Sequence, residues 1–280
     1  MTQASTRRSP PRLLRVKHTC MLSPHLKRIS LTGKALEDFP EKSEGAHIKI
    51  MLPQAHQRVP ILPTLGPTGV LWPPDRERPI TRTYSVSRYD AADQTLDIDF
   101  VLHTAPGPAS DWARNARPGD QVGIAGPGGP DRIRPADWYL LVADPSALAA
   151  LAAALRALPV ESKGYALIEV SDESEVLGLE HPDGVSLRWL YRGDQLASHS
   201  TLLLDAVKAL PWMDGLPSVM VAGENTQVVA IRDYLLQTRN VPRTQLYAVP
   251  YWKDQHTEES YHAERHRIMD ELEAPRAKDA

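Results

Sequence analysis

A guanidinium, an aromatic ring and a hydroxyl stand within four consecutive residues of this chain. Arg82 offers a forked cation to a phosphate, Tyr84 a flat apolar face to a fused ring, and Ser85 a hydroxyl to a ring nitrogen. With the intervening Thr83, these side chains could hold the ring portion of a flavin dinucleotide. Taken alone, the same pattern is also typical of an ordinary strand with an exposed cation.

A second element offers what the phosphates of such a ligand need. Gly107 and Pro108 indicate the start of a helix, where free backbone N–H groups and the helix dipole favour a pyrophosphate. Because the two elements complement each other, we expect one FAD site built from both. Its predicted contacts are Arg82, Thr83, Tyr84, Ser85, His103, Gly107, Pro108, Ala109, Ser110 and Trp112.

Length and composition predict a globular protein of two domains. The 280 residues exceed a typical single core, and no apolar run approaches the roughly 18 residues of a membrane span. Cys20 is the only cysteine, which excludes an internal disulfide and a multi-thiolate iron–sulfur cluster. The single cysteine indicates the reducing cytoplasm. We also expect a monomer that neither enters the membrane nor binds nucleic acid, although the sequence does not determine the oligomeric state.

The net charge of −3 conceals an asymmetry along the chain. Residues 1–88 carry 15 lysines and arginines against 6 acidic residues, so the first part is positive and the remainder strongly negative. This distribution is compatible with an ordinary solvated surface. A basic region beside a flavin site could also attract an anionic substrate.

The first half of the sequence alternates apolar and polar residues in short segments, the pattern of half-buried antiparallel strands. Such strands predict a small β-barrel. The proline-rich stretch 53–79 lacks periodicity, and we interpret it as an excursion loop, either a rim over a site or a flexible insertion. The expected strands cover residues 13–16, 26–31, 47–52, 83–86, 95–102 and 121–125.

From about residue 133, strands alternate with amphipathic helices, which predicts a doubly wound parallel sheet. Within it we expect a turn over 223–225 and a final helix over 258–272. The sequence thus predicts a disordered tail (1–12), an antiparallel FAD-binding β-barrel domain (13–132) and an NAD(P)H-binding-like α/β domain with a C-terminal helix (133–280).

The α/β domain has candidate residues for a nicotinamide reductant at the carboxyl ends of its strands, where ligands of such sheets bind. No Gly-x-Gly-x-x-Gly fingerprint follows a predicted strand, so a tightly held dinucleotide is not indicated. Glu169 and Asp172 could disfavour a 2′-phosphate or serve only as cap or solvent residues, which leaves NADH and NADPH both open. The candidates are Asp144, Ser146, Gly223, Glu224 and Trp252.

The final helix carries His262 and His266 four residues apart, with Glu259 on the same face. A catalytic zinc needs three protein ligands in a dry pocket. We therefore interpret this segment as a polar terminal helix and predict no metal site.

Several short segments of the chain carry a more specific pattern. They are Arg82 to Ser85 with Arg88 and Asp90, Asp97 to His103, Gly107 to Ala113, Arg117 to Asp120, Ile124 to Gly129, Ala222 to Glu224 and Tyr251 to Lys253. Together these segments resemble the siderophore-interacting proteins, flavin-dependent ferric-siderophore reductases of the ferredoxin-reductase superfamily. The chain departs from the family in Ser87 before a single Arg88, in its first α/β turn (Asp144–Ala150), and in the segment 253–255, where the family favours arginines and glycine.

The resemblance implies that FAD carries electrons from NADH or NADPH to a ferric siderophore, which then releases Fe(II). Tyr84 would pack against the isoalloxazine, Ser85 would bond near its reactive nitrogen and Arg82 would hold phosphate. His103 and the backbone N–H groups of Ala109 and Ser110 would hold the portion from ribityl to pyrophosphate. The family places basic substrate-binding residues at the positions of Lys49 and Lys253, and Arg76 and Arg78 could extend that rim.

Two other functions stay open at this point. The chain could bind a ferric siderophore without turnover, or it could pass electrons between its flavin and a protein partner such as ferredoxin. The siderophore itself is not identified, because the expected rim is a loop and loops carry specificity without a periodic signal.

Overall fold

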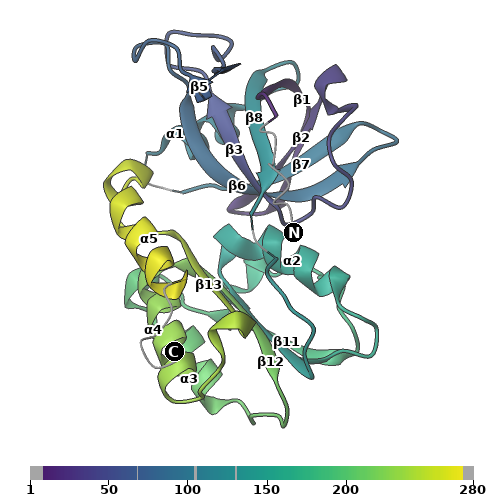
Figure 1. The fold of residues 1–280 in the computed structure, drawn as a ribbon, viewed down its shortest axis with the longest axis vertical. Helices are drawn as coiled ribbons and strands as arrows, with labels where there is room; N and C mark the ends of the chain where they lie inside the picture. Colours follow the sequence, from purple (N-terminus) through teal and green to yellow (C-terminus); the bar gives the residue numbers. More distant parts are fainter. Residues whose placement is uncertain (1–8, 68, 104–105, 130, 274–280) are drawn as a thin grey trace. The chain divides into compact units, whose positions relative to one another are not determined.

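The computed structural model describes residues 9–67, 69–103, 106–129 and 131–273 and divides into two compact units, residues 1–130 and 131–280 (Figure 1). Each unit has its own hydrophobic core. Residues 1–8 of the expected tail lie outside the described part of the chain. Arg12, the last residue of that tail, begins the first strand and is 7% exposed, with its guanidinium bonded to Ala35 O at 2.9 Å and to the Asp38 carboxylate at 3.1 Å.

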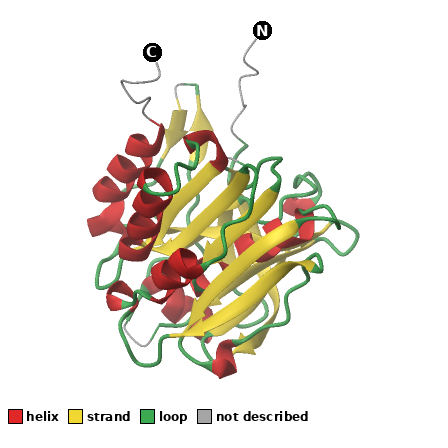
Figure 2. Cartoon of the chain, turned by 90° about the horizontal axis from the view of Figure 1, so that it is seen from below, coloured by secondary structure: helices red, strands yellow, loops and turns green. Residues whose placement is uncertain are grey.

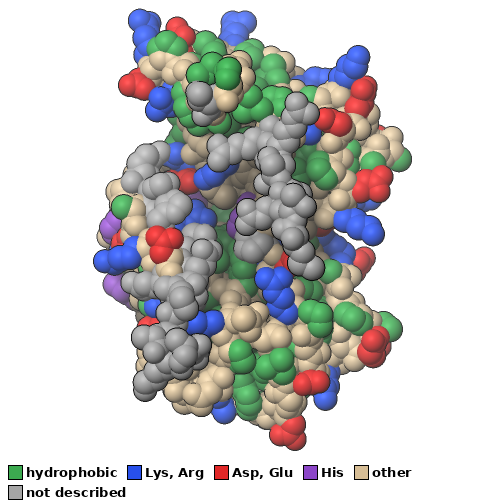
Figure 3. Space-filling view, viewed as in Figure 1, with side chains coloured by type: hydrophobic (Ala, Val, Ile, Leu, Met, Phe, Trp, Pro, Cys, Tyr) green, Lys and Arg blue, Asp and Glu red, His purple; other side chains and the backbone are tan. Residues whose placement is uncertain are grey.

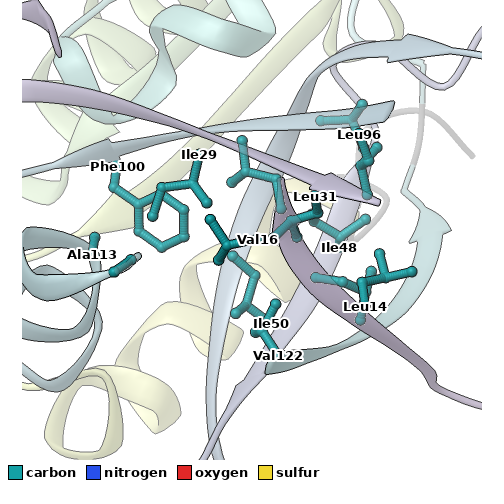
Figure 4. Packing of buried hydrophobic residues seen from close by; sticks show 14 of the residues in the cluster. Leu14, Val16, Ile29, Leu31, Ile48, Ile50, Leu96, Phe100, Ala113 and Val122 are labelled. Atoms are coloured by element: carbon teal, nitrogen blue, oxygen red, sulfur yellow. The ribbon is translucent and has the colours of Figure 1, made fainter. Parts of the chain in front are cut away.

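Six antiparallel strands close the first unit into a barrel, which confirms the predicted fold. Their order around the barrel is β1, β2, β7, β6, β3 and β8. Alternate residues point inward, so Ile29 and Leu31 of β2 and Ile48 and Ile50 of β3 are at most 1% exposed (Figure 4). The strands are β1 (Arg12–Ser23), β2 (Leu26–Thr32), β3 (His47–Leu52), β6 (Ile80–Asp90), β7 (Thr95–Val101) and β8 (Gln121–Gly128).

Three shorter elements complete the barrel unit. The stretch 53–79 differs from the expected irregular loop, because its middle folds into a hairpin of β4 (Thr64–Gly66) and β5 (Gly69–Leu71). Strands of three residues are too short for their alternation to be recognised in sequence. The 3-10 turn η1 (Lys34–Leu36) follows β2, and helix α1 (Pro108–Asn115) begins where Gly107 and Pro108 predicted a helix start.

Five parallel strands form the sheet of the second unit, in the order β11, β10, β9, β12 and β13. The chain runs outward from β9 to β10 and β11 and then returns to the other side of β9 for β12 and β13. The strand order therefore reverses between β9 and β12, the place where sheets of this kind bind ligands. The bounds are β9 (Trp138–Ala143), β10 (Lys163–Val170), β11 (Gly184–Tyr191), β12 (Pro217–Glu224) and β13 (Leu246–Trp252).

Helices lie against this sheet, as predicted for a doubly wound fold (Figure 2). Helices α3 and α4 share a core with Trp138, Leu140 and Val142 of β9, whereas α2 contacts β9 without contributing a residue to that core. The helices are α2 (Leu148–Ala157), α3 (Leu202–Ala209), α4 (Asn225–Gln237) and α5 (Glu258–Glu273), with 3-10 turns η2 (Pro145–Ala147), η3 (Glu173–Glu175), η4 (Ala197–His199) and η5 (Arg243–Gln245).

The junction of β12 and α4 is tighter than the sequence predicted. We expected a turn over 223–225, but β12 continues through Glu224 and α4 begins at the next residue. Glu224 serves as the N-cap and thereby replaces a separate turn. Among the described residues, no helix is both long and apolar enough to cross a membrane.

Candidate functional site

An aromatic cluster connects the two elements of the predicted flavin site. The Tyr84 ring of β6 lies 4.5 Å from the Phe100 ring of β7, and Phe100 lies 5.7 Å from the Trp112 ring of α1, measured between ring centroids. Phe100 is 1% exposed and belongs to the barrel core. Phe100 was not among the predicted site residues, because its alternation with Leu96 and Ile98 indicated only a core strand.

The hydroxyl of Ser85 is buried without a protein partner. Ser85 is 6% exposed, and its Oγ makes no hydrogen bond to any described residue. Ser87, two residues along β6, is equally buried, but its Oγ donates to Asp99 at 2.8 Å and accepts from Arg28 at 2.7 Å. Buried polar atoms in native proteins are rarely unpaired. The Ser85 hydroxyl therefore suits a ring nitrogen of a flavin as its missing partner.

Side chains of α1 accept hydrogen bonds from the backbone that leads into the helix. The His103 N–H donates to Ser110 Oγ at 3.0 Å, and the Gly107 N–H donates to Asp111 Oδ2 at 3.1 Å. Ser110 is only 3% exposed, and its hydroxyl is already engaged by the His103 N–H. Gly107 is the N-cap and has no side chain to cap the first-turn amides, which suits a pyrophosphate there. Arg114 pairs with Asp111 at 2.8 Å and balances that carboxylate.

Two predicted cationic residues lie on the neighbouring strands β3 and β6. The register pairs Lys49 with Thr83, and Lys49 Nζ donates to Thr83 Oγ1 at 2.5 Å. Arg82 donates from one guanidinium nitrogen to the backbone oxygen of Thr81 at 2.9 Å. Lys49 is exposed and Arg82 is half-buried. This part of the barrel therefore offers positive charge to a phosphate or an anionic chelate.

Asp97 and Asp99, which belong to one of the family-like segments, have a structural role. Asp99 accepts two hydrogen bonds from the Arg28 guanidinium, at 2.7 and 2.8 Å, and Asp97 accepts one from the Ser30 hydroxyl at 2.5 Å. The bond to Asp99 raises the pKa of Arg28. These contacts hold β2 against β7.

The excursion between β3 and β6 exposes apolar side chains. Arg78 lies 5.4 Å from the centroid of the Trp72 ring and 3.4 Å from the Asp75 carboxylate, and both Arg76 and Arg78 are exposed. Figure 3 shows hydrophobic side chains at the surface where Figure 1 labels β5. The exposed large hydrophobic residues of this stretch are Val59, Ile61, Leu65, Leu71 and Trp72.

In the second unit, Asp144 joins the ends of three strands at the reversal of strand order. Its Oδ1 accepts from the backbone N–H of Ser146 at 2.8 Å and from the Ser146 hydroxyl at 2.5 Å. Its Oδ2 accepts from the backbone N–H of Glu224 at 2.8 Å and from the indole N–H of Trp252 at 2.7 Å. Asp144 is only 3% exposed. The ends of β9, β12 and β13 are thus held by one carboxylate.

Both carboxylate oxygens of Glu224 also accept hydrogen bonds, as those of Asp144 do. Its Oε2 accepts from the N–H groups of Thr226 at 2.6 Å and Gln227 at 3.3 Å, and its Oε1 accepts from the Asp254 N–H at 3.2 Å. Gly223 precedes it at φ +149°, and a Cβ there would lie 2.7 Å from Asp144 Oδ2. Glycine is therefore required for the close approach of that carboxylate. The structure brings all five residues predicted for the reductant site together.

Glu169 is enclosed and does not face solvent. It is 0% exposed, its Oε2 accepts from Ser200 Oγ at 2.6 Å, and its Oε1 accepts from Gln227 Nε2 at 3.1 Å. Burial raises the pKa of the Glu169 carboxyl, against the opposing effect of these two hydrogen bonds. Asp172 accepts from the Ser174 N–H at 2.8 Å and caps its own turn. Glu169 therefore has a structural role in place of contact with a 2′-phosphate.

Lys253 is already paired with an acidic residue of α5. Its Nζ lies 2.6 Å from Glu264 Oε2 and 5.9 Å from the centroid of the Tyr261 ring. The next residue, Asp254, accepts from Ser198 Oγ at 2.8 Å. The segment that departs from the family pattern is thus held by specific contacts with η4 and α5.

Within the part of the chain that the structure describes, no group of three or more His, Cys, Asp or Glu residues could hold a metal ion. The side chains of Glu259, His262 and His266, considered above as a possible metal site, lie outside the described ones.

An antiparallel barrel followed by a five-stranded parallel sheet is the fold of ferredoxin reductases, a class of flavoproteins. Residues 15–131 match the siderophore-interacting FAD-binding domain, and residues 136–255 match the siderophore-interacting protein family. The chain belongs to the siderophore-interacting protein family and carries its FAD-binding domain.

Characterised proteins similar to this chain include reductases. Ferric vibriobactin reductase ViuB of Vibrio cholerae is 40% identical over 264 residues, which cover 93% of this chain and 96% of that protein. The NADPH-dependent ferric-chelate reductase of Escherichia coli is 35% identical over 62% of this chain and 68% of its own length. The crystal structure of the siderophore-interacting protein SipS from Aeromonas hydrophila has a TM-score of 0.82 and 39% identity, covering 93% of this chain and 98% of that chain. These similarities confirm the family inferred from sequence.

Proposed function

We propose that this protein is an FAD-dependent reductase that transfers electrons from NADH or NADPH to a ferric siderophore and releases Fe(II). The observation that carries the proposal is the buried, unpartnered hydroxyl of Ser85 next to the aromatic cluster of Tyr84, within an FAD-binding domain. The named activities of the ferric vibriobactin reductase and the ferric-chelate reductase support the substrate class.

Reduction explains how the iron would be released. Siderophores bind Fe(III) through hard anionic oxygens, and the less charged Fe(II) is held far more weakly by such ligands. A nicotinamide donates two electrons together and iron accepts one. Bound FAD supplies the conversion between these two kinds of transfer.

The protein's own side chains would bind and orient the cofactor. Tyr84 offers its ring to the isoalloxazine and Ser85 offers the hydroxyl for a ring nitrogen, while Arg82 supplies charge for phosphate. With Thr83, these residues form the ring-binding part of the site. The pyrophosphate would lie at the N-terminus of α1, bordered by His103, Gly107, Pro108, Ala109 and Ser110, with Trp112 behind it.

Substrate recognition would depend on positively charged side chains, because a siderophore that binds Fe(III) through anionic oxygens is an anionic chelate. Lys49 of the barrel and Lys253 after β13 are the proposed contacts. Lys253 would exchange the Glu264 carboxylate for an oxygen of the chelate. Trp252, with Asp144, Ser146, Gly223 and Glu224, would border the nicotinamide.

We further propose that the protein works as a monomer in the cytoplasm, where NADH and NADPH are available. The single cysteine is exposed and needs no oxidising compartment.

The test is anaerobic stopped-flow absorbance of the FAD-loaded protein. Mixing with NADH or NADPH should bleach the flavin, and a ferric chelate added next should restore its absorbance while a ferrous indicator reports Fe(II). The variant Lys49→Met should slow only the second phase, because Lys49 is assigned to the chelate.

Two outcomes would replace this function with one of its alternatives. If reduced ferredoxin bleaches the flavin and neither NADH nor NADPH does, the electron donor is a protein. Tight binding of the ferric chelate without reoxidation of a reduced flavin would identify a siderophore-binding protein without turnover.

A further inference from the structure

The place where doubly wound sheets usually bind a dinucleotide is occupied here by the chain's own carboxylates. In such folds the pyrophosphate lies at the reversal of strand order and is held by backbone N–H groups at the start of a helix. The reversal in this protein lies between β9 and β12, which end at Asp144 and Glu224.

Both helix starts at this place are already capped. Asp144 Oδ1 binds the Ser146 N–H at the turn that leads into α2, and Glu224 Oε2 binds the Thr226 and Gln227 N–H groups of α4. A pyrophosphate would need the same donors. Because the two carboxylates are 3% and 1% exposed, neither can swing into solvent without breaking up the junction.

The charge of this junction also opposes a phosphate. The hydrogen-bond partners of Asp144 and Glu224 among the described residues are backbone N–H groups, the Ser146 hydroxyl and the Trp252 indole, all of which are neutral. Two buried carboxylates are therefore linked through the Glu224 N–H without a neutralising cation in that network. Like charges repel strongly where water is excluded.

The same network presents a flat surface beside the excluded place. The bond to Asp144 fixes the orientation of the Trp252 indole, and the ring remains partly exposed. An aromatic face held in one orientation suits the planar nicotinamide ring. This edge of the sheet thus offers an aromatic surface, while the backbone N–H groups beside it are already bonded.

We propose that Asp144 and Glu224 exclude the reductant's pyrophosphate from the strand-order reversal, so that the donor is recognised by its nicotinamide mononucleotide half. This inference rests on the proposed function, because it concerns the reductant of that reaction. Its consequence is that the AMP portion of NADH contributes little to flavin reduction.

The direct test compares NADH with reduced nicotinamide mononucleotide as electron donors to the FAD-loaded wild-type protein. The second-order rate constants for flavin bleaching should agree within about tenfold, which corresponds to about 1.4 kcal/mol. A larger advantage of NADH would overturn the inference while leaving the proposed function intact. Failure of NADH, NADPH and the mononucleotide alike would overturn both.

A matched pair of variants isolates the carboxylate. Asp144→Ser keeps an N-cap residue but removes the charge, and should raise the NADH rate constant at least several-fold relative to that of the mononucleotide. Asp137→Ser is the control, because Asp137 precedes the opposite end of β9 and accepts the Leu216 N–H at 2.6 Å in a similar contact. It should leave the ratio unchanged.

Retained FAD content and a cooperative thermal transition show that each variant is folded. A ratio that stays the same in folded Asp144→Ser would contradict the exclusion. If that variant does not fold, the wild-type comparison of the two donors decides the matter.

Discussion

The indole N–H of Trp252 donates to Oδ2 of Asp144 at 2.7 Å, although 108 residues separate the two in sequence. This bond links the last strand of the α/β sheet to its central strand, at the edge where ligands of such sheets bind. Because Asp144 is buried, its carboxylate depends on donors within the protein, and the indole N–H is one of them.

Trp252→Phe should separate the hydrogen bond from the flat aromatic surface. Loss of the N–H leaves the Asp144 carboxylate with one fewer donor, which should lower the free energy of unfolding by about 1–3 kcal/mol. The ring remains, so flavin bleaching by NADH should fall less than in Trp252→Ala. Chemical denaturation and stopped-flow absorbance check the two parts. Equal rates in the two variants would show that the ring face has no role in reduction.

Gly223→Ala should destabilise the second unit. The new methyl group would lie 2.7 Å from Asp144 Oδ2, at a backbone φ of +149° that side chains rarely adopt. We expect a loss of about 1–3 kcal/mol in unfolding free energy, measured by denaturant titration. Gly178→Ala is the control, because a Cβ there meets no atom within 4 Å. Equal stability of the two variants would contradict the close approach of the Asp144 carboxylate.

Ser85→Ala should affect FAD binding, whereas Ser87→Ala should affect stability. The Ser85 hydroxyl has no hydrogen-bond partner in the part of the chain that the structure describes, so its removal should weaken FAD binding by about threefold to tenfold and leave the stability of the apoprotein nearly unchanged. The Ser87 hydroxyl binds Asp99 and Arg28, so its removal should cost about 1 kcal/mol of stability without weakening FAD binding. Flavin fluorescence quenching and thermal unfolding distinguish the two. Unchanged FAD affinity in Ser85→Ala would remove that residue from the site.

Glu169→Gln should change the pH dependence of stability. The folded-state pKa of Glu169 is raised above the ordinary 4.5, so the folded protein holds this proton over a pH range in which the unfolded chain releases it. Stability therefore falls as pH rises from about 4.5 through the folded-state pKa, and the penalty persists above it.

Glutamine keeps both hydrogen-bonding positions of Glu169 without this titration. The variant should match the wild type near pH 4 and become relatively more stable as the pH approaches neutrality. Thermal unfolding across this range measures the difference. A constant difference between the two proteins at every pH would show that Glu169 does not titrate on unfolding.

Glu264→Gln should strengthen binding of an anionic ferric chelate. The carboxylate lies 2.6 Å from Lys253 Nζ and competes with the substrate for that cation. For a partly exposed pair the gain should be about 1 kcal/mol or less, seen as a lower KM for ferric citrate. Asp270→Asn changes the net charge equally on the same helix and should have no such effect. Equal KM values for the two variants would assign any change to overall charge.

The fold could be predicted because it depends on local patterns, whereas the residues assigned to the ring-binding part of the site stay a prediction. Alternation in segments such as 26–31 and 47–52 follows from strand geometry, and the Gly107–Pro108 pair follows from the chemistry of a helix start. The types of Tyr84 and Ser85 by themselves suit a flavin. The hairpin at 64–71 was missed because three-residue strands show no recognisable period.

The roles of the acidic residues could not be predicted in the same way. Asp144, Glu169 and Glu224 all follow or end strands, and the sequence does not distinguish a carboxylate that faces a ligand from one that is enclosed. Their environments depend on Gln227, Ser200 and Trp252, which come from distant parts of the chain.

The sequence by itself determined the family, the two-unit architecture and the residue types proposed for the flavin site, because strand periodicity and short motifs are properties of neighbouring residues. Only the tertiary structure decided that Ser85 is buried without a hydrogen-bond partner among the described residues while Ser87 is bonded, and that Asp144 is held by Trp252 and Glu224. Such contacts arise when β13 and β12 align beside β9, and hydrogen bonding then depends on distances that no local pattern encodes.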